Sequence, residues 1–470
     1  MEKKYFKFDK KILIIGFGSI GQAVLPLIFR HLDISPQQVN IISKKADGIE
    51  LANKYGVRLH EEAITQANYK AILTSQLSEG DFLLNLSVDV SSVDLMIWCQ
   101  QQHVLYLDTC IEPWEGGYVD KSIPSSMRSN YALREAALQL RKTTANTTTA
   151  VITHGANPGL VSHFVKQALM NIAKDNEMHI EKPNTKLEWG MLAEALSIKV
   201  IHIAERDTQL SAAPKKNNEF VNTWSIDGFI SEGSQPAELG WGTHERHFPH
   251  DAHHHEFGCK SAIYLNRPGA STRVRTWTPL AGPFHGFLIT HGESISISDY
   301  LTVKMEDTIM YRPTVHYAYH PCEDAVLSLH ELAGREWQQQ ETQRLLFDEI
   351  IDGIDELGVL LMGNKKGAYW FGSQLSIHEA RELVPNNTAT SLQVAIGVLA
   401  AMMWAMQNPN AGITEPDEID YEFIMNISLP YLGNVAGFYT NWTPLNERER
   451  LFPETLDQTD PWQFVNVRVN

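Results

Sequence analysis

Short apolar runs and helically spaced apolar residues alternate along the first third of the chain. An apolar run at residues 12–15 leads into a glycine-rich turn, and helically spaced apolar residues follow that turn. Similar runs predict further strands, at residues 39–42, 82–86, 104–107 and 148–153. Helical spacing predicts the helices that accompany them, at residues 48–55, 92–102 and 131–141. Strands that alternate with helices favour a doubly wound parallel sheet.

The pattern changes after His154, where helical spacing becomes rarer and Gly, Pro, His and aromatic residues become frequent. We expect a second domain with a mixed sheet in this part of the chain. Helical spacing returns later, at residues 331–351 and 390–406. The predicted fold class is therefore α/β, with a Rossmann sheet and a second mixed α/β (α+β) domain. The predicted domains are residues 1–153, residues 154–385, and a C-terminal segment, 386–470, that packs back on the first domain.

The glycine-rich turn has the spacing of a dinucleotide-binding fingerprint, Gly16-x-Gly18-x-x-Gly21. The first glycine permits the tight turn, the second lets a pyrophosphate approach the backbone, and the third lets helix and strand pack closely. Ser19 and Ile20 complete the turn at the start of the helix, whose unpaired N–H groups favour phosphate. We expect all five residues to bind the cofactor.

The second predicted strand ends in Ser43 and Lys44, with no acid where NAD-binding domains place a ligand for the ribose 2′-hydroxyl. Ser43 could accept that hydroxyl, whereas the Ser-Lys-Lys sequence also suits the 2′-phosphate of NADP. The spacing of residues alone leaves the choice between the two cofactors open.

Polar side chains follow the next two predicted strands, where parallel strands line a cofactor crevice. They are Asn85, Ser87 and Asp89 after one strand, and Asp108, Thr109 and Glu112 after the other. An alternative role for Ser87 or Asp89 is to cap the helix that follows.

Composition adds a weak argument about ligands. The formal net charge is -17, from 56 acidic and 39 basic residues, which disfavours nucleic acids and anionic lipids and favours small cations, although solubility alone explains such a charge. The four cysteines match neither a CxxC pair nor a zinc site, which suits a reducing compartment. Residues 1–10 lack a signal-peptide run, and the apolar run at 394–406 is too short for a bilayer, so we expect a cytoplasmic protein.

The segment Thr153-His-Gly-Ala-Asn-Pro-Gly159 follows a predicted strand and precedes a helical pattern that begins near Leu160. Together with GFGSIG, TCIEPWEGG, AERDTQ, NTWSIDGFISEGS and LITHGES, it resembles the bacterial homospermidine synthases, which are relatives of the saccharopine and carboxynorspermidine dehydrogenases. The resemblance runs in order through nearly the whole chain.

This resemblance implies a reaction that depends on NAD but is redox-neutral overall. One putrescine amine is oxidised, ammonia is lost, a second putrescine condenses, and the imine is reduced to sym-homospermidine. Spermidine can also donate the aminobutyl group, with release of 1,3-diaminopropane. The implied architecture is a Rossmann domain completed by C-terminal residues, and a mixed domain that binds the polyamine substrates and mediates homodimerisation.

The resemblance also assigns substrate-site residues. Trp224 matches the active-site tryptophan, whose ring attracts a cation by roughly 0.5 to 2 kcal/mol and so favours an iminium. Glu205 and Glu232 match acids that hold ammonium groups, each contact giving roughly 4 kcal/mol at an effective dielectric of about 20 before desolvation. Without the resemblance, we would place such a tryptophan in the core and such glutamates on the surface.

Four further residues are predicted near the reacting atoms. Asp89 and Glu112 would lie at the nicotinamide end, and Asn157 would orient the amine or the nicotinamide amide. An alkylammonium with a pKa of about 10 must lose a proton before it can release hydride, and His291 is the candidate proton relay. The alternative for His291 is a structural histidine.

Other functions were weighed against these residues. His253 to His255 are adjacent histidines without the spacing of a metal site, so no metal is expected. A carboxynorspermidine or saccharopine dehydrogenase must hold a substrate carboxylate, for which Arg206 or Arg267 would be available. A third possibility is a module that senses NAD without catalysis. No basic stripe suggests nucleic acid.

Overall fold

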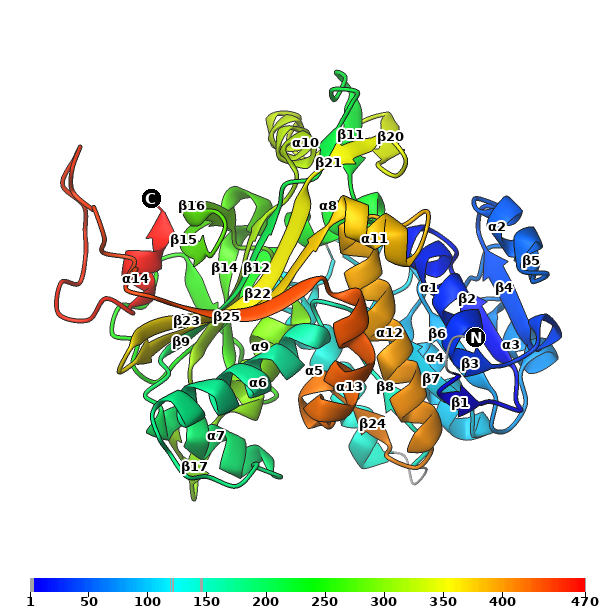
Figure 1. The fold of residues 1–470 in the computed structure, drawn as a ribbon, viewed down its shortest axis with the longest axis horizontal. Coiled ribbons are helices and arrows are strands. Elements are labelled where there is room, and N and C mark those ends of the chain that lie inside the picture. The colour runs from blue at the N-terminus through cyan, green and yellow to red at the C-terminus, as the bar shows by residue number, and fades with distance from the viewer. Residues whose placement is uncertain (1–3, 119, 121, 144–146, 470) are drawn as a thin grey trace.

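A seven-stranded parallel sheet forms the first half of the molecule in the computed structural model, which describes residues 4–118, 120, 122–143 and 147–469 (Figure 1). The strand order is β24-β8-β7-β6-β2-β4-β5. These strands are β2 (Ile12–Ile15), β4 (Val39–Ser43), β5 (Arg58–Glu61), β6 (Phe82–Asn85), β7 (Leu105–Asp108), β8 (Ala150–Val151) and β24 (Ile413–Thr414). The predicted doubly wound parallel sheet is thereby confirmed.

Alternate residues of β2 face two different helical layers, because side chains of a strand point to opposite faces in turn. Ile12 and Ile14 belong to the core shared with α1 (Ser19–His31) and α12 (Ala389–Gln407), which lie side by side on one face (Figure 1). Leu13 and Ile15 pack in a separate core with α4 (Ser92–Gln102) and α5 (Asn130–Thr143). Burial on both faces explains why these strands are apolar throughout.

The second half is built on a mixed sheet whose main path runs β13-β14-β12-β19-β9-β22-β23-β25. Its strands are β9 (Val200–Asp207), β12 (Pro236–Gly240), β13 (Ala252–His254), β14 (Ala262–Pro268), β15 (Arg273–Thr278), β16 (Gly282–Phe287), β19 (Thr314–His320), β22 (Ile354–Asn364), β23 (Gly367–Ser376), β25 (Asn434–Thr440) and β26 (Arg468–Val469). Strands β9 and β19 are parallel, and β22 is antiparallel to β9. The predicted mixed second domain is confirmed.

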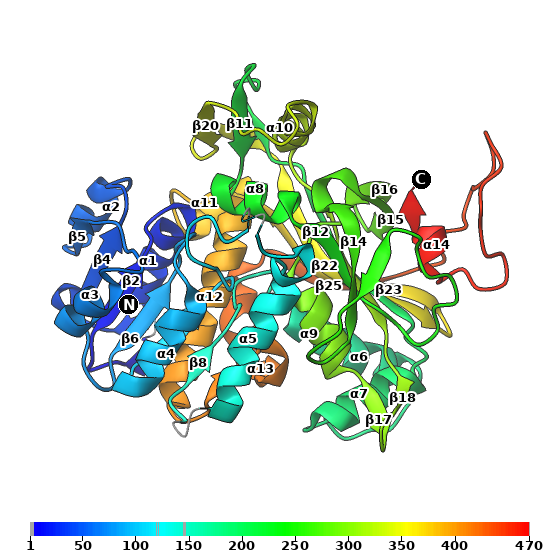
Figure 2. The same ribbon diagram turned by 180° about the vertical axis from the view of Figure 1, so that it is seen from behind.

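Some helices of the second half pack on this sheet, and others pack on neighbouring helices or on short strands outside it. The helices of this half are α6 (Leu160–Asp175), α7 (Lys186–Ala195), α8 (Ile226–Ser234), α9 (Gly292–Tyr300), α10 (Glu323–Gly334), α11 (Ile377–Leu383) and α13 (Tyr421–Ser428). Seen from behind, α5 and α9 lie next to each other between the two sheets (Figure 2). The contact between α5 and α9 joins the two halves close to the ends of β7 and β8.

The predicted helix at 331–351 is wrong beyond Gly334. Helix α10 ends there, and Glu336 and Trp337 have φ angles of 52° and 65°, a backbone conformation that cannot continue a right-handed helix. The chain then forms β20 (Thr342–Leu345), which pairs in parallel with β11 (Glu219–Asn222), and β21 (Ile350–Asp352). Pairing with a distant strand overrides the local helical spacing.

Two smaller elements of the first half were not predicted from the sequence. The sequence did not predict α3 (Tyr69–Gln76) or the edge strand β5, whereas α2 (Ile49–Lys54) lies where a helix was expected. Both missed elements are short and only partly buried, so their apolar periodicity is weak.

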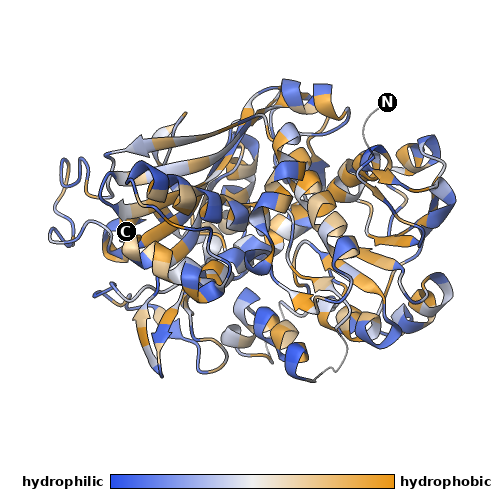
Figure 3. Ribbon diagram, turned by 60° about the horizontal axis from the view of Figure 1, so that its bottom comes forward, coloured by the Kyte–Doolittle hydropathy of each residue, from blue (hydrophilic) through white to orange (hydrophobic). Residues whose placement is uncertain are grey.

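Helix α12 is longer than the apolar run at 394–406. Its 19 residues are long and apolar enough by length and composition to cross a membrane, so the expectation that the run is too short was wrong on length. However, 89% of its most apolar window is buried within the protein, as expected for a core helix. Apolar segments are found on both strands and helices in the interior of the molecule (Figure 3).

The C-terminal segment contacts both halves. Helix α12 and strand β24 join the first half, where β24 pairs with β8. Strand β25 instead pairs with β23 of the mixed sheet, and β26 pairs with β15. The exact domain boundaries remain a prediction.

Candidate functional site

The glycine turn between β2 and α1 can be formed only by glycine at two of its three positions. Gly16 has a φ of +87°, and a Cβ there would lie 2.6 Å from the Leu86 carbonyl oxygen. A Cβ on Gly21 would lie 2.8 Å from the Gly16 oxygen. By contrast, apart from Gly18 and its two chain neighbours, no heavy atom of the described chain lies within 4 Å of a Cβ placed on Gly18. The space beside Gly18 therefore suits a pyrophosphate at the start of α1.

The predicted cofactor residues lie along one edge of the first sheet. The strand register aligns Ile15 with Ile42 and with Asn85, and aligns Asn85 with Asp108. Ser43 therefore ends β4, and Lys44 follows it, at the same edge where Ser19 and Ile20 begin α1. Ser87 and Thr109 follow β6 and β7 at this edge. Lys44 is exposed and lies 3.6 Å from Glu115.

Asn85 and Asp108 point into the protein interior. The Tyr106 hydroxyl donates a hydrogen bond to Asp108 Oδ2 (2.8 Å) and accepts one from Asn85 Nδ2 (3.2 Å). The Thr153 backbone N–H donates to Asp108 Oδ1 (2.7 Å), and burial raises the pKa of Asp108 to about 7. This network fixes the chain at Thr153, where the segment that carries Asn157 begins.

Asp89 follows β6 and Glu112 follows β7, and the two acids lie near each other and near Glu232. Burial, followed by repulsion from Glu232 and Asp89, raises the pKa of Glu112 to about 8. Burial, followed by Glu115, also raises the pKa of Asp89. Helix α4 is capped by Ser91, which accepts a hydrogen bond from the Asp94 N–H (3.2 Å), so the alternative that Ser87 or Asp89 caps it is wrong.

Glu205 is buried at the end of β9 and receives two hydrogen bonds on one oxygen. Tyr317 Oη donates to Glu205 Oε2 at 2.6 Å, and Asn157 Nδ2 donates to the same atom at 2.9 Å. Burial raises the pKa of Glu205 to about 7, although the Tyr317 hydrogen bond lowers it. The two neighbouring acids Asp207 and Asp355 are also buried and have raised pKa values. A cation that entered this corner would favour the ionised form of these acids.

His291 is held between two carboxylates. Its Nε2 lies 2.9 Å from Glu232 Oε2, and its Nδ1 lies 3.2 Å from Glu293 Oε1. Burial lowers the pKa of His291, but Glu232 and Glu293 outweigh it and raise the pKa well above the usual range. Both carboxylates therefore favour the protonated, imidazolium form of His291.

Aromatic rings connect Glu205 with the pair formed by Glu232 and His291. The His291 and Tyr317 ring centroids lie 4.5 Å apart, and Tyr317 stacks on Tyr319 at 5.1 Å. Trp224 is half-buried before α8 and donates a hydrogen bond from Nε1 to Tyr319 Oη (3.1 Å). The structure therefore brings Trp224, Glu205, Asn157, Glu232 and His291 together.

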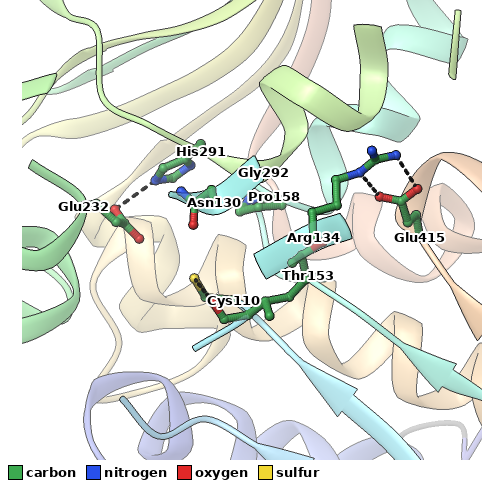
Figure 4. Close-up of a pocket in the computed structure, with 10 residues that line it drawn as sticks. Cys110, Asn130, Arg134, Thr153, Pro158, Glu232, His291, Gly292 and Glu415 are labelled. Atoms are coloured by element: carbon green, nitrogen blue, oxygen red, sulfur yellow. Dashed lines mark hydrogen bonds and ion pairs between the residues drawn. The ribbon is translucent and has the colours of Figure 1, made fainter. Parts of the chain in front are cut away.

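A small cavity adjoins Glu232 and His291 (Figure 4). It is lined by Cys110, Ile111, Asn130, Arg134, Thr153, Pro158, Glu232, His291, Gly292 and Glu415. Its walls come from both halves of the molecule.

Similar proteins agree with this architecture. Residues 12–151 match the saccharopine dehydrogenase NADP binding domain, and residues 155–438 match the saccharopine dehydrogenase C-terminal domain. Homospermidine synthases from Blastochloris viridis and Mesorhizobium japonicum are 53% and 49% identical over 99% of this chain and 98% and 97% of their own lengths. The chain belongs to the homospermidine synthase family. A crystal structure of the Legionella pneumophila homospermidine synthase in complex with NAD matches with a TM-score of 0.93 and 52% identity over 99% of both chains.

A more distant structural match is a saccharopine dehydrogenase. The enzyme from Saccharomyces cerevisiae shares 11% identity and a TM-score of 0.53, which shows the common fold alone. Of the two arginines considered for a dehydrogenase, Arg206 lies over the Phe284 ring, and Arg267 donates to the Ser271 carbonyl oxygen (2.8 Å). Each arginine has such a contact, although its buried Nε has no hydrogen-bond partner in the described part of the chain.

Sequence reasoning missed several residues of this homospermidine synthase site. Tyr317 and Tyr319 alternate on β19, so period-2 spacing with Glu205 on the paired strand could have indicated them. Glu293 lies two residues after His291, but only the helix start directs it back to the ring. Nothing in the local sequence indicates Asp355.

The histidine run does not converge on one point. His255 is buried against Glu238 (3.1 Å) and stacks on Tyr131, whereas His253 and His254 are exposed. Within the described ranges, no three His, Cys, Asp or Glu side chains are grouped to hold a metal ion.

Proposed function

We propose that this chain is a homospermidine synthase that converts two putrescine molecules into sym-homospermidine and ammonia, and that also accepts spermidine as aminobutyl donor. The observation that carries the proposal is the joining of a cation-binding acid, Glu205, to an acid–imidazolium pair, Glu232 and His291, through the ring of Tyr317. A diamine needs both features, because one nitrogen stays charged while the other must lose its proton.

NAD is the cofactor, and the open space beside Gly18 with its glycine-only neighbours fits the pyrophosphate. When bound, NAD supplies a hydride acceptor that returns the hydride within the same cycle. The NAD complex of the Legionella pneumophila relative supports NAD over NADP, although the matching domain family is described as NADP binding. We assign Ser43 to the ribose and Gly16, Gly18, Ser19, Ile20 and Gly21 to the phosphates.

Glu205 holds the distal ammonium group of the diamine, with Asn157 and Tyr317 fixing the carboxylate. Since burial raises its pKa to about 7, an arriving cation shifts Glu205 to the ionised form and gains a buried ion pair. Trp224 stabilises the positive charge of the iminium through its ring face. Asp89 and Glu112 add negative potential at the nicotinamide end.

Glu232 accepts the proton from the reacting amine, and His291 stabilises the carboxylate and returns a proton to the leaving nitrogen. This sharpens the expectation for His291, because an imidazolium donates protons and cannot accept them. Asn85, Asp108 and Thr109 support the sheet edge beside this group.

Incubation of the purified protein with putrescine and NAD tests the proposal. We expect homospermidine and ammonia in equal amounts, with no net formation of NADH, and NAD bound to the protein as purified. Net NADH formation without homospermidine would instead indicate a dehydrogenase.

The variants Glu232→Gln and Trp224→Leu separate catalysis from nucleotide sensing. We expect Glu232→Gln to lose roughly a hundredfold or more in kcat, because proton transfer contributes about that much, while NAD stays bound. Equal rates of homospermidine formation by the variants and the wild type would contradict the roles assigned to Glu232 and Trp224. NAD binding by a wild-type protein that forms no homospermidine would instead indicate the sensing function.

We further propose a cytoplasmic homodimer, in line with the resemblance. Light scattering during size-exclusion chromatography measures its mass, and a monomer at micromolar concentration would exclude the dimer.

A further inference from the structure

The cavity beside Glu232 and His291 is too small for putrescine or for 1,3-diaminopropane. Its volume is about 20 Å³, which is room for roughly one water-sized molecule. Glu232 and His291 are shared with the substrate site, whereas Trp224 and Glu205 are not part of its lining. The cavity therefore opens on the acid–imidazolium pair and leads away from the residues that hold the diamine.

An ion pair between Arg134 and Glu415 lines the cavity on the side away from Glu232 (Figure 4). The Arg134 guanidinium forms a bidentate pair with Glu415 (2.6 and 2.8 Å) and contacts Asp299 (3.0 Å) (Figure 4). The Arg134 side chain is 4% exposed, so the pair lies away from solvent. Because the charges of Arg134 are neutralised by these acids, the guanidinium does not compete for Glu232.

We propose that this cavity receives the ammonia that leaves when putrescine is the donor. The proposal rests on the proposed function and adds a site for one product. In the exchange step, the amine of the second putrescine forms a new C–N bond to the imine carbon, and the bond to the original nitrogen breaks. That nitrogen takes a proton and leaves as ammonia, with no change in oxidation state.

The geometry of this step explains why a separate place is needed. The carbon that carries both nitrogens is tetrahedral, so the arriving and leaving nitrogens point in different directions. His291 lines the cavity and can donate the proton to the leaving nitrogen. When spermidine is the donor, the leaving group is 1,3-diaminopropane, which is too large for the cavity and must leave by the way substrates enter.

Gly292→Ala narrows the cavity without straining the backbone. A Cβ on Gly292 would lie 3.7 Å from Pro158 Cγ and 4.0 Å from Thr153 Cγ2, which are ordinary contacts. Gly292 is the first residue of α9, where alanine is compatible with the helix. We expect an unchanged melting temperature and unchanged NAD content.

The donor decides how this variant behaves. With putrescine alone, we expect kcat to fall about tenfold, equivalent to about 1.4 kcal/mol in the barrier. With saturating spermidine as donor and putrescine as acceptor, we expect kcat to change less than about twofold relative to wild type, because no ammonia is released with this donor. An equal loss with both donors, or no loss with either, would overturn the proposal. Wild-type protein that makes no homospermidine from either donor would instead refute the proposed function.

Cys110→Ala provides an independent test by enlarging the cavity. Its sulfur lines the cavity and lies outside the residues assigned to catalysis. We expect ammonium chloride to inhibit wild type and variant alike, and methylammonium chloride to inhibit the variant at least about fivefold more strongly than wild type, a difference of about 1 kcal/mol. Sodium chloride at equal ionic strength is the control. Equal inhibition of both proteins by methylammonium would indicate that the cavity holds water only, and would overturn the proposal.

Discussion

Glu205 illustrates how individual neighbours tune one carboxyl group. Burial raises its pKa, and the hydrogen bond from Tyr317 lowers it, so that the pKa lies near 7. A carboxyl group with this pKa is sensitive to small changes in its surroundings near neutral pH. If Glu205 binds the distal ammonium group as proposed, that binding depends on the Tyr317 hydroxyl group.

Replacing Tyr317 with Phe removes this hydroxyl and keeps the ring packed against Tyr319 and His291. The pKa of Glu205 should then rise above 7, because the hydrogen bond that lowered it is lost. We expect the acid limb of the kcat/KM profile for putrescine to shift to higher pH. At pH 7 kcat/KM should fall about tenfold, because a hydrogen bond to a charged group contributes about 1.5 kcal/mol. Recovery at high pH distinguishes this from structural damage, and an unshifted profile would contradict the assignment.

The turn between β2 and α1 combines glycines that the backbone geometry requires with one, Gly18, that we propose to contact the cofactor. Gly16 and Gly21 are required by the close approach of the backbone, whereas Gly18 borders open space. The spacing of the motif is the same for all three, but the structure separates their roles.

The pair Gly16→Ala and Gly18→Ala tests that separation. Gly16→Ala meets the Leu86 backbone and has an unfavourable φ, so we expect a loss of about 1 to 3 kcal/mol in unfolding free energy together with the loss of NAD. Gly18→Ala should keep the stability of the NAD-free protein within about 0.5 kcal/mol but bind NAD poorly, because its Cβ occupies the approach of the pyrophosphate. Urea unfolding and nucleotide content measure both, and NAD retention by Gly18→Ala would contradict the site.

The whole molecule is held together by a buried network between its halves. Arg134 on α5 pairs with Glu415 after β24 and with Asp299 on α9, whose partner Lys186 lies on α7. These residues come from four separate stretches of the chain. The network joins the cofactor half to the substrate half beside the site.

Replacing Arg134 with Met leaves the buried Glu415 carboxylate without its cation and leaves Asp299 paired with Lys186 alone. We expect a loss of about 3 to 5 kcal/mol in unfolding free energy, the usual cost of breaking a buried ion pair on one side. The double variant Arg134→Met/Glu415→Gln should recover part of this loss, because one uncompensated charge is removed. Urea unfolding provides the measurement, and a loss under about 1 kcal/mol would show that the network behaves like a surface pair.

Stability should depend on pH through the buried acids. Asp108, Glu205 and Glu112 have pKa values of about 7, 7 and 8 in the folded protein, against about 4 when unfolded. Between pH 6.5 and 8 the folded state therefore holds more protons than the unfolded state, so stability falls as pH rises. We expect a lower melting temperature at pH 8 than at pH 6.5 without substrate, and a larger stabilisation by putrescine at pH 8.

Glu112→Gln is the matched control for this dependence. It should flatten the slope between pH 6.5 and 8, because a group whose folded pKa is raised no longer titrates there. A melting temperature that rises across this window in the substrate-free protein would contradict the assignment.

The sequence alone determined the features that depend on neighbouring residues along the chain. Strand and helix alternation, the glycine turn and the burial of β2 on both faces follow from periodicity and turn chemistry over a few residues. The motif segments also indicated Glu205, Trp224, Glu232 and His291 through resemblance, although no single one of them is distinctive by itself.

Tertiary structure decided which distant groups meet and how strongly they are buried. Glu232 and His291 are 59 residues apart, and Tyr317 reaches Glu205 across 112 residues, so local spacing carries no signal of either contact. The strand pairing of β20 replaced a helix expected from spacing, because hydrogen bonds to a remote strand outweigh local propensity. The same packing sets the pKa values and the size of the cavity beside Glu232, since burial and volume are properties of the assembled fold.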